Sequence, residues 1–235
     1  MAVTYPRTLP SFVKGFDGFV LDLIYPVGQN RTNGGDVIRV QYAAPYWTLD
    51  WPTPPLSRAD KAALQAWWMS LGGGRKTFLA YHPFRQWPTN YATEAAVLAL
   101  TRAGGGAFDG TFEITGAPTA RAMTSSTSAT TRAPASLVLT AGDMIGVSQS
   151  GKYSLHRVTE TVTATAGGAF TTADANEIAI EPPLQPTIFT ASVGGGLIAD
   201  IIRPVAEFVP AADKWSSPET VVASPARFGG NSLVF

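Results

Sequence analysis

By residue type, four acidic side chains of this protein could catalyse hydrolysis. Asp50, Asp109, Glu113 and Glu160 could supply the two carboxyl groups that glycoside hydrolysis requires. No spacing along the chain singles out any two of them, and every β protein of this size carries such residues. We therefore predict that these four are exposed acidic residues on strands and that the chain has no catalytic residue.

Two histidines are the only imidazole groups in the sequence. His82 follows a predicted strand and His156 lies inside one, and neither belongs to a His-Glu-x-x-His motif. The chain also has no cysteine, which excludes disulfides and thiolate metal sites. We expect both histidines to have structural roles and predict that the chain binds no metal.

Motifs for nucleophilic catalysis or cofactor binding are missing. The sequence contains no Gly-x-Ser-x-Gly turn, which a serine hydrolase of the α/β type would need. Three triple glycines occur, at residues 72–74, 104–106 and 194–196. None is followed directly by Lys-Ser or Lys-Thr, and none leads from a predicted strand into a predicted helix. We predict no cofactor.

Tryptophans offer a second kind of site, because carbohydrate-binding proteins stack sugars on aromatic rings. Two of the candidates alternate on a predicted strand and two lie on a predicted helix, which favours packing in a core or between subunits. Carbohydrate binding is kept as the alternative interpretation. The five tryptophans concerned are Trp47, Trp51, Trp67, Trp68 and Trp87.

The composition limits the partners of this protein. Among 235 residues only 14% are charged and the net charge is zero, which argues against nucleic acid as the main partner. The first residues lack the pattern of a signal peptide, so we expect synthesis in a cytoplasm without processing. The longest apolar run, 19–25, contains Asp22 and is too short to cross a bilayer, so we expect no membrane span. A surface with so few charges is compatible with a stable protein where other subunits cover large parts of it.

Strands dominate the first part of the chain. Ile38, Val40 and Tyr42 alternate with polar residues, and a second alternating run covers residues 47–51, so both predict half-buried strands. Residues 19–25 are apolar on both faces. This pattern predicts a strand that is central in its sheet or covered by a neighbour.

One helix is predicted with a clear beginning and end. Ser57 can cap it with Asp60 three residues later, and the glycines at 72–74 end it, which gives a helix over 57–71. We interpret it as a helix that plugs one open side of a small barrel. Its expected apolar stripe is formed by Leu64, Trp68 and Leu71, with Ala59, Ala63 and Trp67 beside it.

The composition changes near residue 92, and residues 92–195 are rich in Thr, Ala, Gly and Ser. Residues 124–136 predict a mobile loop, and strands are expected in 136–139, 142–147 and 153–162. A turn is expected at Gly151-Lys152, and a change of apolar register within 153–162 predicts a β-bulge. Residues 103–108 and 166–170 predict glycine turns that lead into strands.

The chain becomes apolar again from Leu197 to Val209, and its last three residues are Leu233, Val234 and Phe235. Such an end is expected to join a sheet or an interface. We therefore predict a mainly β protein with two domains. The first combines 1–91 and 196–235 and includes the helix, and the second, 92–195, is a small inserted β-barrel.

The order of these features resembles that of distal tail proteins of long-tailed bacteriophages and related tail components. The resemblance begins with the proline-rich approach to the helix, TPPLSRADKAALQAWWMSLGGG, followed by Lys76-Thr77-Phe78-Leu79 and by His82-Pro83. It continues with Gly142-Asp143-Met144-Ile145, with Leu155-His156-Arg157-Val158, with residues 178–184 and with the apolar C-terminal segment. It covers most of the chain through the order and spacing of short motifs.

The resemblance implies a structural virion protein and not an enzyme. A split-barrel or sandwich-like domain would form a hexameric ring that joins the tail tube to the baseplate at the tail tip, and the inserted OB-like barrel would point outwards. Implied partners are copies of the chain, the tail tube protein, tail hub or baseplate proteins and the tape-measure protein, with DNA passing through the channel without specific binding. The family has no motif of functional residues to carry over.

Three alternatives to this function are considered. The middle barrel could be a host-surface carbohydrate-binding module, or the chain could be a neighbouring tube or tip-hub component of the tail. An enzyme that degrades host glycans ranks behind both, because it would need two carboxyl groups at hydrolase spacing in a cleft.

Overall fold

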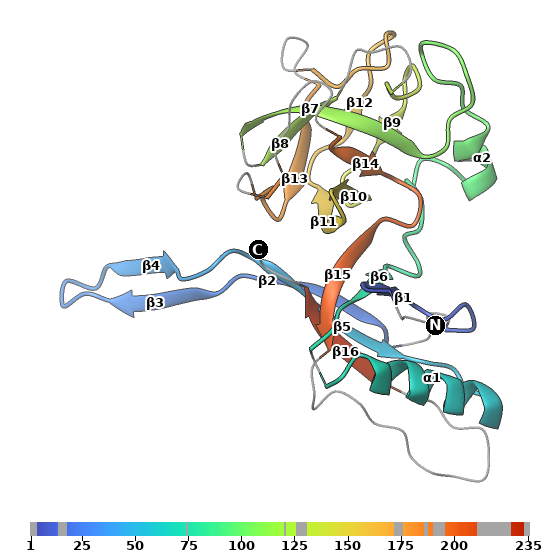
Figure 1. The fold of residues 1–235 in the computed structure, drawn as a ribbon. Helices are drawn as coiled ribbons and strands as arrows, with labels where there is room; N and C mark the ends of the chain where they lie inside the picture. The colour runs from blue at the N-terminus through green and yellow to red at the C-terminus, as the bar shows by residue number, and fades with distance from the viewer. Residues whose placement is uncertain are drawn as a thin grey trace. The chain divides into compact units, whose positions relative to one another are not determined.

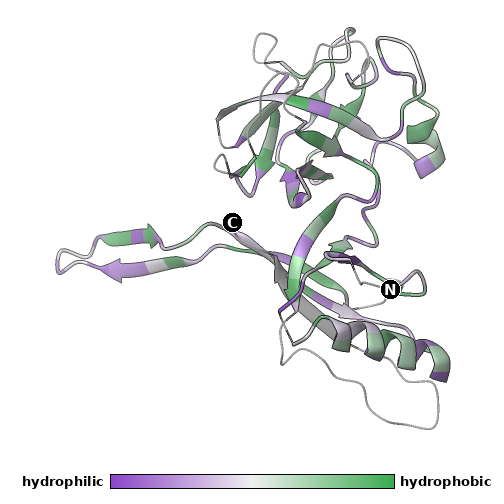
Figure 2. Ribbon diagram, viewed as in Figure 1, coloured by the Kyte–Doolittle hydropathy of each residue, from purple (hydrophilic) through white to green (hydrophobic). Residues whose placement is uncertain are grey.

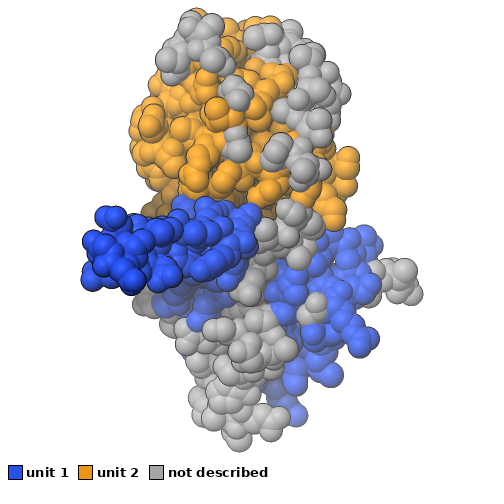
Figure 3. Space-filling model, turned by 90° about the vertical axis from the view of Figure 1, so that its left-hand side faces the viewer, with its two compact units in different colours: residues 1–80, 207–234 blue, residues 81–206, 235 orange. Residues whose placement is uncertain are grey.

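A computed structural model shows a mainly β protein with two compact units. Figure 3 colours residues 1–80 and 207–234 as unit 1, and residues 81–206 and 235 as unit 2. The two units are described separately below. The structure describes residues 4–13, 18–73, 75–119, 121–125, 131–171, 176–185, 188–189, 196–210 and 227–232.

The boundaries of unit 2 are wider than the sequence predicts. We expected the middle domain to cover 92–195, whereas residues 81–91 and 196–206 also belong to unit 2. The reason is packing: Trp87 and Tyr91 lie against the core of unit 2, and Leu197, Ala199 and Ile201 are buried within it. The composition changes at residue 92, but residues that contribute to this core lie both before residue 92 and after residue 195.

Unit 1 is built on an open six-stranded sheet (Figure 1). The alternating burial of the β5 strand confirms the predicted half-buried strand, with Trp47, Leu49 and Trp51 buried. The segment 19–25 contains β2, an edge strand with exposed Val20 and Ile24, so the prediction of a strand that is central or covered by a neighbour is wrong. The strand order is β1 (Arg7–Thr8), β6 (Phe78–Tyr81), β15 (Val205–Pro210), β16 (Arg227–Ser232), β5 (Tyr46–Pro52) and β2 (Val20–Ile24).

The predicted helix forms as α1 (Arg58–Ser70). Ser57 caps it: its Oγ accepts a hydrogen bond from the Asp60 amide at 3.1 Å and donates one to Asp60 Oδ2 at 2.7 Å. Trp67 packs edge-on against Phe78 with ring centroids 5.5 Å apart, and Phe78 stacks on Phe208 of β15 at 5.8 Å. The helix therefore covers one face of an open sheet, and the expectation that it plugs a barrel is wrong.

A β-hairpin extends beyond this sheet (Figure 1). Its strands, β3 (Val27–Arg31) and β4 (Val37–Gln41), pair only with each other and continue the β2–β5 pair. All five residues of β4 are exposed, so the prediction of a half-buried strand there is wrong. The alternation of apolar and polar residues predicted the strand correctly. Burial of one face also requires another layer of the protein against it, and in unit 1 no described element covers the hairpin.

Unit 2 contains a closed six-stranded barrel. Its core is apolar, with Phe112, Ile145 and Phe170 among its buried members. The barrel order is β10 (Met144–Gln149), β11 (Lys152–Val158), β13 (Ile178–Glu181), β8 (Ala122–Ser125), β7 (Thr111–Thr119) and β14 (Ile198–Asp200), and a separate pair joins β9 (Val138–Leu139) to β12 (Val162–Thr163).

Three local predictions for unit 2 differ from the structure. Ser150 and Gly151, with φ of 49° and 78°, form the turn between β10 and β11, one residue before the predicted pair. The strand β11 pairs in continuous register and ends at Val158, and Val162 starts a different strand, so the predicted bulge is wrong. The sequence also did not predict α2 (Glu94–Leu98), which Thr93 caps by accepting from the Ala96 amide at 3.1 Å.

Two expectations fall partly outside the described residues. Within the predicted loop 124–136, residues 124 and 125 belong to β8, and 126–130 are outside the described part. The final residues 233–235 are outside it as well, although β16 before them does join the sheet. No helix in the described ranges has the length and apolar character that crossing a membrane requires.

Candidate functional site

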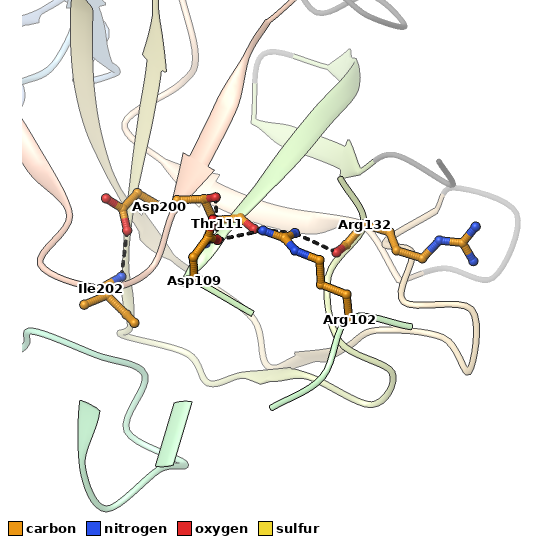
Figure 4. A network of polar contacts seen from close by, with 6 residues as sticks. All are labelled: Arg102, Asp109, Thr111, Arg132, Asp200 and Ile202. Atoms are coloured by element: carbon orange, nitrogen blue, oxygen red, sulfur yellow. Dashed lines mark hydrogen bonds and ion pairs between the residues drawn. The ribbon is translucent and has the colours of Figure 1, made fainter. Parts of the chain in front are cut away.

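The polar contacts around Asp109 form a charged network in unit 2 (Figure 4). Asp109 Oδ1 accepts hydrogen bonds from Arg102 Nη2 at 2.6 Å, from the Thr111 amide at 2.9 Å and from Thr111 Oγ1 at 2.7 Å. Partial burial acts to raise the pKa of Asp109, but the Thr111 hydrogen bonds and the Arg102 charge outweigh it and lower that pKa. Asp109 is thus an ionised hydrogen-bond acceptor that fixes an arginine.

A second carboxyl group, Asp200 at the end of β14, lies in the same region, because Asp200 pairs with Thr111 in the barrel. Burial raises the pKa of Asp200 to about 6; the hydrogen bond from the Ile202 amide to Asp200 Oδ1, 2.9 Å long, opposes this, and the negative charge of Asp109 adds to it. The sequence analysis did not single out Asp200. A lone aspartate near the end of an apolar run gives no signal that it pairs with Thr111, two residues after another carboxylate.

The other acidic candidates do not join this pair. Glu113 is buried, and its Oε2 accepts from Thr131 Oγ1 at 2.8 Å, so its predicted exposure is wrong. Glu160 is exposed between β11 and β12, and Asp50 lies on β5 of unit 1. The sequence therefore named one member, Asp109, of the carboxyl pair that the fold brings together.

Arg102 connects separate segments of unit 2. Its side chain is 11% exposed, and its Nη1 donates to the carbonyl oxygens of Thr111 at 2.9 Å and Arg132 at 3.1 Å. These bonds hold Thr111 at the start of β7, Asp109 and Arg132 together. The network's evident role is structural, because the arginine and Asp109 Oδ1 satisfy each other and nearby backbone groups.

We expect the Arg102→Ala substitution to lower the free energy of unfolding of unit 2 by about 2 kcal/mol, because it leaves several acceptors without a donor. The matched control is Arg203→Ala, since Arg203 is 55% exposed and pairs with Glu94 at the surface. That control should cost under about 1 kcal/mol. Urea unfolding followed by circular dichroism measures both, and equal losses would contradict the role given to Arg102.

His156 is fully buried in β11. Its Nδ1 lies 2.7 Å from the carbonyl oxygen of Pro182, and because a carbonyl only accepts, Nδ1 carries the proton. Burial lowers the pKa of His156 to about 4, against the opposing effect of the Pro182 hydrogen bond. Its Nε2 has no hydrogen-bond partner among the described residues. This is a neutral core histidine, in agreement with the structural role expected from the sequence.

His82 lies after β6 and accepts a hydrogen bond at Nδ1 from the Phe84 amide, 3.2 Å away. Partial burial, then the positive charges of Arg85 and Arg157, lower its pKa to about 4. Across the described ranges, no three His, Asp or Glu side chains gather in a way that could hold a metal ion.

Four of the five candidate tryptophans are buried in a core, and the fifth, Trp87, is partly buried. Trp47, Trp51, Trp67 and Trp68 are buried in unit 1, and the Phe19 ring meets Trp51 edge-on at 5.1 Å. Trp87 packs against the core of unit 2 and donates from Nε1 to the Tyr91 carbonyl at 3.1 Å. The burial of Trp47, Trp51, Trp67 and Trp68 confirms their predicted packing in a core.

Unit 1 carries a surface that the sequence analysis missed, on the hairpin of residues 27–42, hereafter the arm. Opposed residues of the β3–β4 ladder share a face, so Ile38, Val40 and Tyr42 lie on one face. The other face is mixed, with Gln29 and Arg39 beside exposed Val27 and Val37. The three apolar side chains are 53%, 50% and 74% exposed. Figure 2 shows the hydrophobic colour of β4. Tyr42 lies over Gly28, where any side chain would overlap the tyrosine ring.

A second apolar surface lies on α1, on the side opposite the buried tryptophans. Ala59, Ala62, Ala66 and Met69 follow helical spacing and are all exposed, Met69 by 70%; we refer to them as the α1 stripe. Ala63 at its flank is exposed too, so the prediction that Ala59 and Ala63 border the buried stripe is wrong. The sequence analysis assigned the apolar residues of the helix to one stripe. In the structure they form two surfaces, one buried against the sheet and one exposed.

These two surfaces, with the structural polar networks of unit 2, are what the geometry offers for function. Neither the models of known protein families nor the curated proteins include a match to this chain.

Proposed function

We propose that this chain is a structural protein of a bacteriophage tail that assembles with copies of itself into a ring, with six subunits, between the tail tube and the baseplate. The observation that carries the proposal is the pair of uncovered apolar surfaces on unit 1, the arm and the α1 stripe. Exposed apolar surface of this kind marks sites of protein association. The resemblance of the sequence to distal tail proteins supports the place in the tail.

In this proposal the two units have different roles. Unit 1, with its helix-backed sheet, forms the ring and supplies its split-barrel or sandwich-like framework. The closed barrel of unit 2 is the OB-like module that points outwards. The tail tube protein, a hub or baseplate protein and the tape-measure protein are the proposed partners, and the tail tip of the virion is the proposed location.

The face of the unit 1 sheet turned away from α1 suits the wall of a channel. The pairing register places Asp22 and Asp50 on this face. These side chains are acidic, and the opposite face carries the buried tryptophans. A wall of carboxylates repels phosphates, so DNA would pass without binding. The chain has no catalytic role in this proposal.

Negative-stain images of the purified full-length protein test the proposal. We expect class averages of a closed ring with a central channel. Single globular particles or open filaments at all concentrations would contradict it, because a head-to-tail contact that does not close forms filaments.

A further inference from the structure

We propose that Asn33, in the turn at the tip of the arm, is a site of spontaneous deamidation, in which its neutral side-chain amide becomes a carboxylate. The turn between β3 and β4 contains the dipeptide Asn33-Gly34, and none of the other four asparagines of the chain precedes a glycine. The inference concerns the chemistry of this turn, so it does not depend on the proposed assembly into a ring.

The reaction needs only the chain itself and water. Once a base in the solvent has removed the amide proton of Gly34, the backbone nitrogen attacks Cγ of Asn33 and forms a succinimide ring. The bond between Cγ and Nδ2 breaks, and Nδ2 leaves as ammonia after taking up a proton. Water then opens the ring at one of its two carbonyl carbons, which gives either aspartate or isoaspartate. No oxidant or reductant takes part.

Both reacting groups are accessible in the turn, since Asn33 and Gly34 are exposed. Other groups hold the turn together. The Thr32 amide donates to the Asp36 carbonyl oxygen at 2.9 Å, and the Asp36 amide donates to Thr32 Oγ1 at 3.1 Å. The Gly35 amide donates to the Thr32 carbonyl oxygen at 2.9 Å. The Gly34 amide and the Asn33 side chain form no hydrogen bond with any described residue, so the attack breaks none of the bonds of the turn.

Glycine at position 34 favours the attack, because a Cβ atom there would crowd the approach of Asn33 Cγ to the backbone nitrogen. The fold itself does not require this glycine. Its φ lies outside the left-handed region, and a Cβ built on it would meet Thr32 Oγ1 at 3.7 Å, an ordinary contact. Gly35, with φ of 89°, is the glycine that the turn requires. An alanine at position 34 therefore separates the reaction from the fold.

Either product changes the tip of the arm. The new carboxylate adds a negative charge close to Asp36, in a chain whose net charge is zero. Isoaspartate also lengthens the main chain of the turn by one carbon. Because the length of a turn fixes the register of a hairpin, this form should disturb the pairing of Arg31 with Val37 that closes the ladder.

Peptide mass mapping of the full-length protein tests the proposal. Trypsin cuts after Arg31 and Arg39 and releases residues 32–39, in which Asn33 carries the only side-chain amide. After the folded protein is kept at mildly alkaline pH, we expect this peptide to gain about 1 Da and to separate by chromatography into an aspartate and an isoaspartate form. The peptide before it, 15–31, is the internal control. It contains Gln29 and Asn30 of the β3 ladder and should gain mass at least about tenfold more slowly.

The matched variant is Gly34→Ala, which should slow the gain in mass at least about tenfold while the circular dichroism spectrum stays unchanged. A synthetic peptide of residues 32–39 gives the rate without the fold. If the folded protein kept its mass while this peptide reacted, the turn would hold the two groups apart and the proposal would be wrong. An equal rate in the natural protein and in Gly34→Ala would also overturn it.

Discussion

The Trp51→Ala protein should unfold unit 1 with a free energy about 4 kcal/mol lower than the natural protein, while the unfolding of unit 2 stays unchanged. Trp51 is a fully buried residue of β5 that packs against Phe19, and removing such a side chain leaves a cavity. Denaturant titration, with tryptophan fluorescence and circular dichroism recorded together, resolves the two transitions.

The matched variant for the other unit is Phe170→Ala. Phe170 is fully buried in the barrel, 5.6 Å from the ring of Phe112, so its loss should lower only the transition of unit 2, again by about 4 kcal/mol. If either variant lowered both transitions equally, the chain would unfold as one body and the division into two units would be wrong. Trp51→Phe, which keeps most of the buried volume, should lie between the natural protein and Trp51→Ala.

An Asp200→Asn protein should lose about 3 kcal/mol of unit 2 stability between pH 6.5 and pH 4. His156 has a pKa of 6.5 when unfolded and about 4 in the barrel, so the unfolded chain binds more protons in this range. The stability that depends on neutral His156 is complete above pH 6.5 and is lost as the pH falls towards 4. A shift of this size corresponds to about 3 kcal/mol.

Asp200 is replaced because it titrates in the opposite sense. Its pKa rises from 3.8 to about 6 on folding, so its contribution is complete below pH 3.8 and is lost as the pH rises through 6. In the natural protein the two effects oppose each other, and we expect a shallow acid dependence. Adding His156→Gln to Asp200→Asn should remove the part of the slope that comes from His156, and the remainder should come from the partly buried His82, whose pKa is also lowered to about 4. Thermal unfolding at several pH values measures this; a slope that His156→Gln leaves unchanged would contradict the assignment.

For unit 1, local sequence patterns predicted the helix and the strands more accurately than they predicted which faces of these elements are buried. The Ser57–Asp60 cap and the alternation of Trp47, Leu49 and Trp51 each depend on a few neighbouring residues, and both are confirmed. The burial of β4 was predicted wrongly, because alternation records the period of a strand but not whether another layer covers it.

The candidate site was predictable to a smaller extent. Asp109 was named from residue type alone, whereas its partner Asp200 is 91 positions later and meets it only through the β7–β14 pairing. The arm and the α1 stripe require knowledge of which side of a strand or helix is covered. Such long-range contacts are set by the fold as a whole and leave no pattern in a single sequence.

The central claim is that this chain assembles with copies of itself, and native mass spectrometry of the purified full-length protein tests it most directly. The account predicts a dominant species of six times the mass of one chain at micromolar concentration, and a shift to single chains when Val40→Asp places a charge on the apolar face of the arm. A single-chain mass for the natural protein at every concentration would contradict the claim.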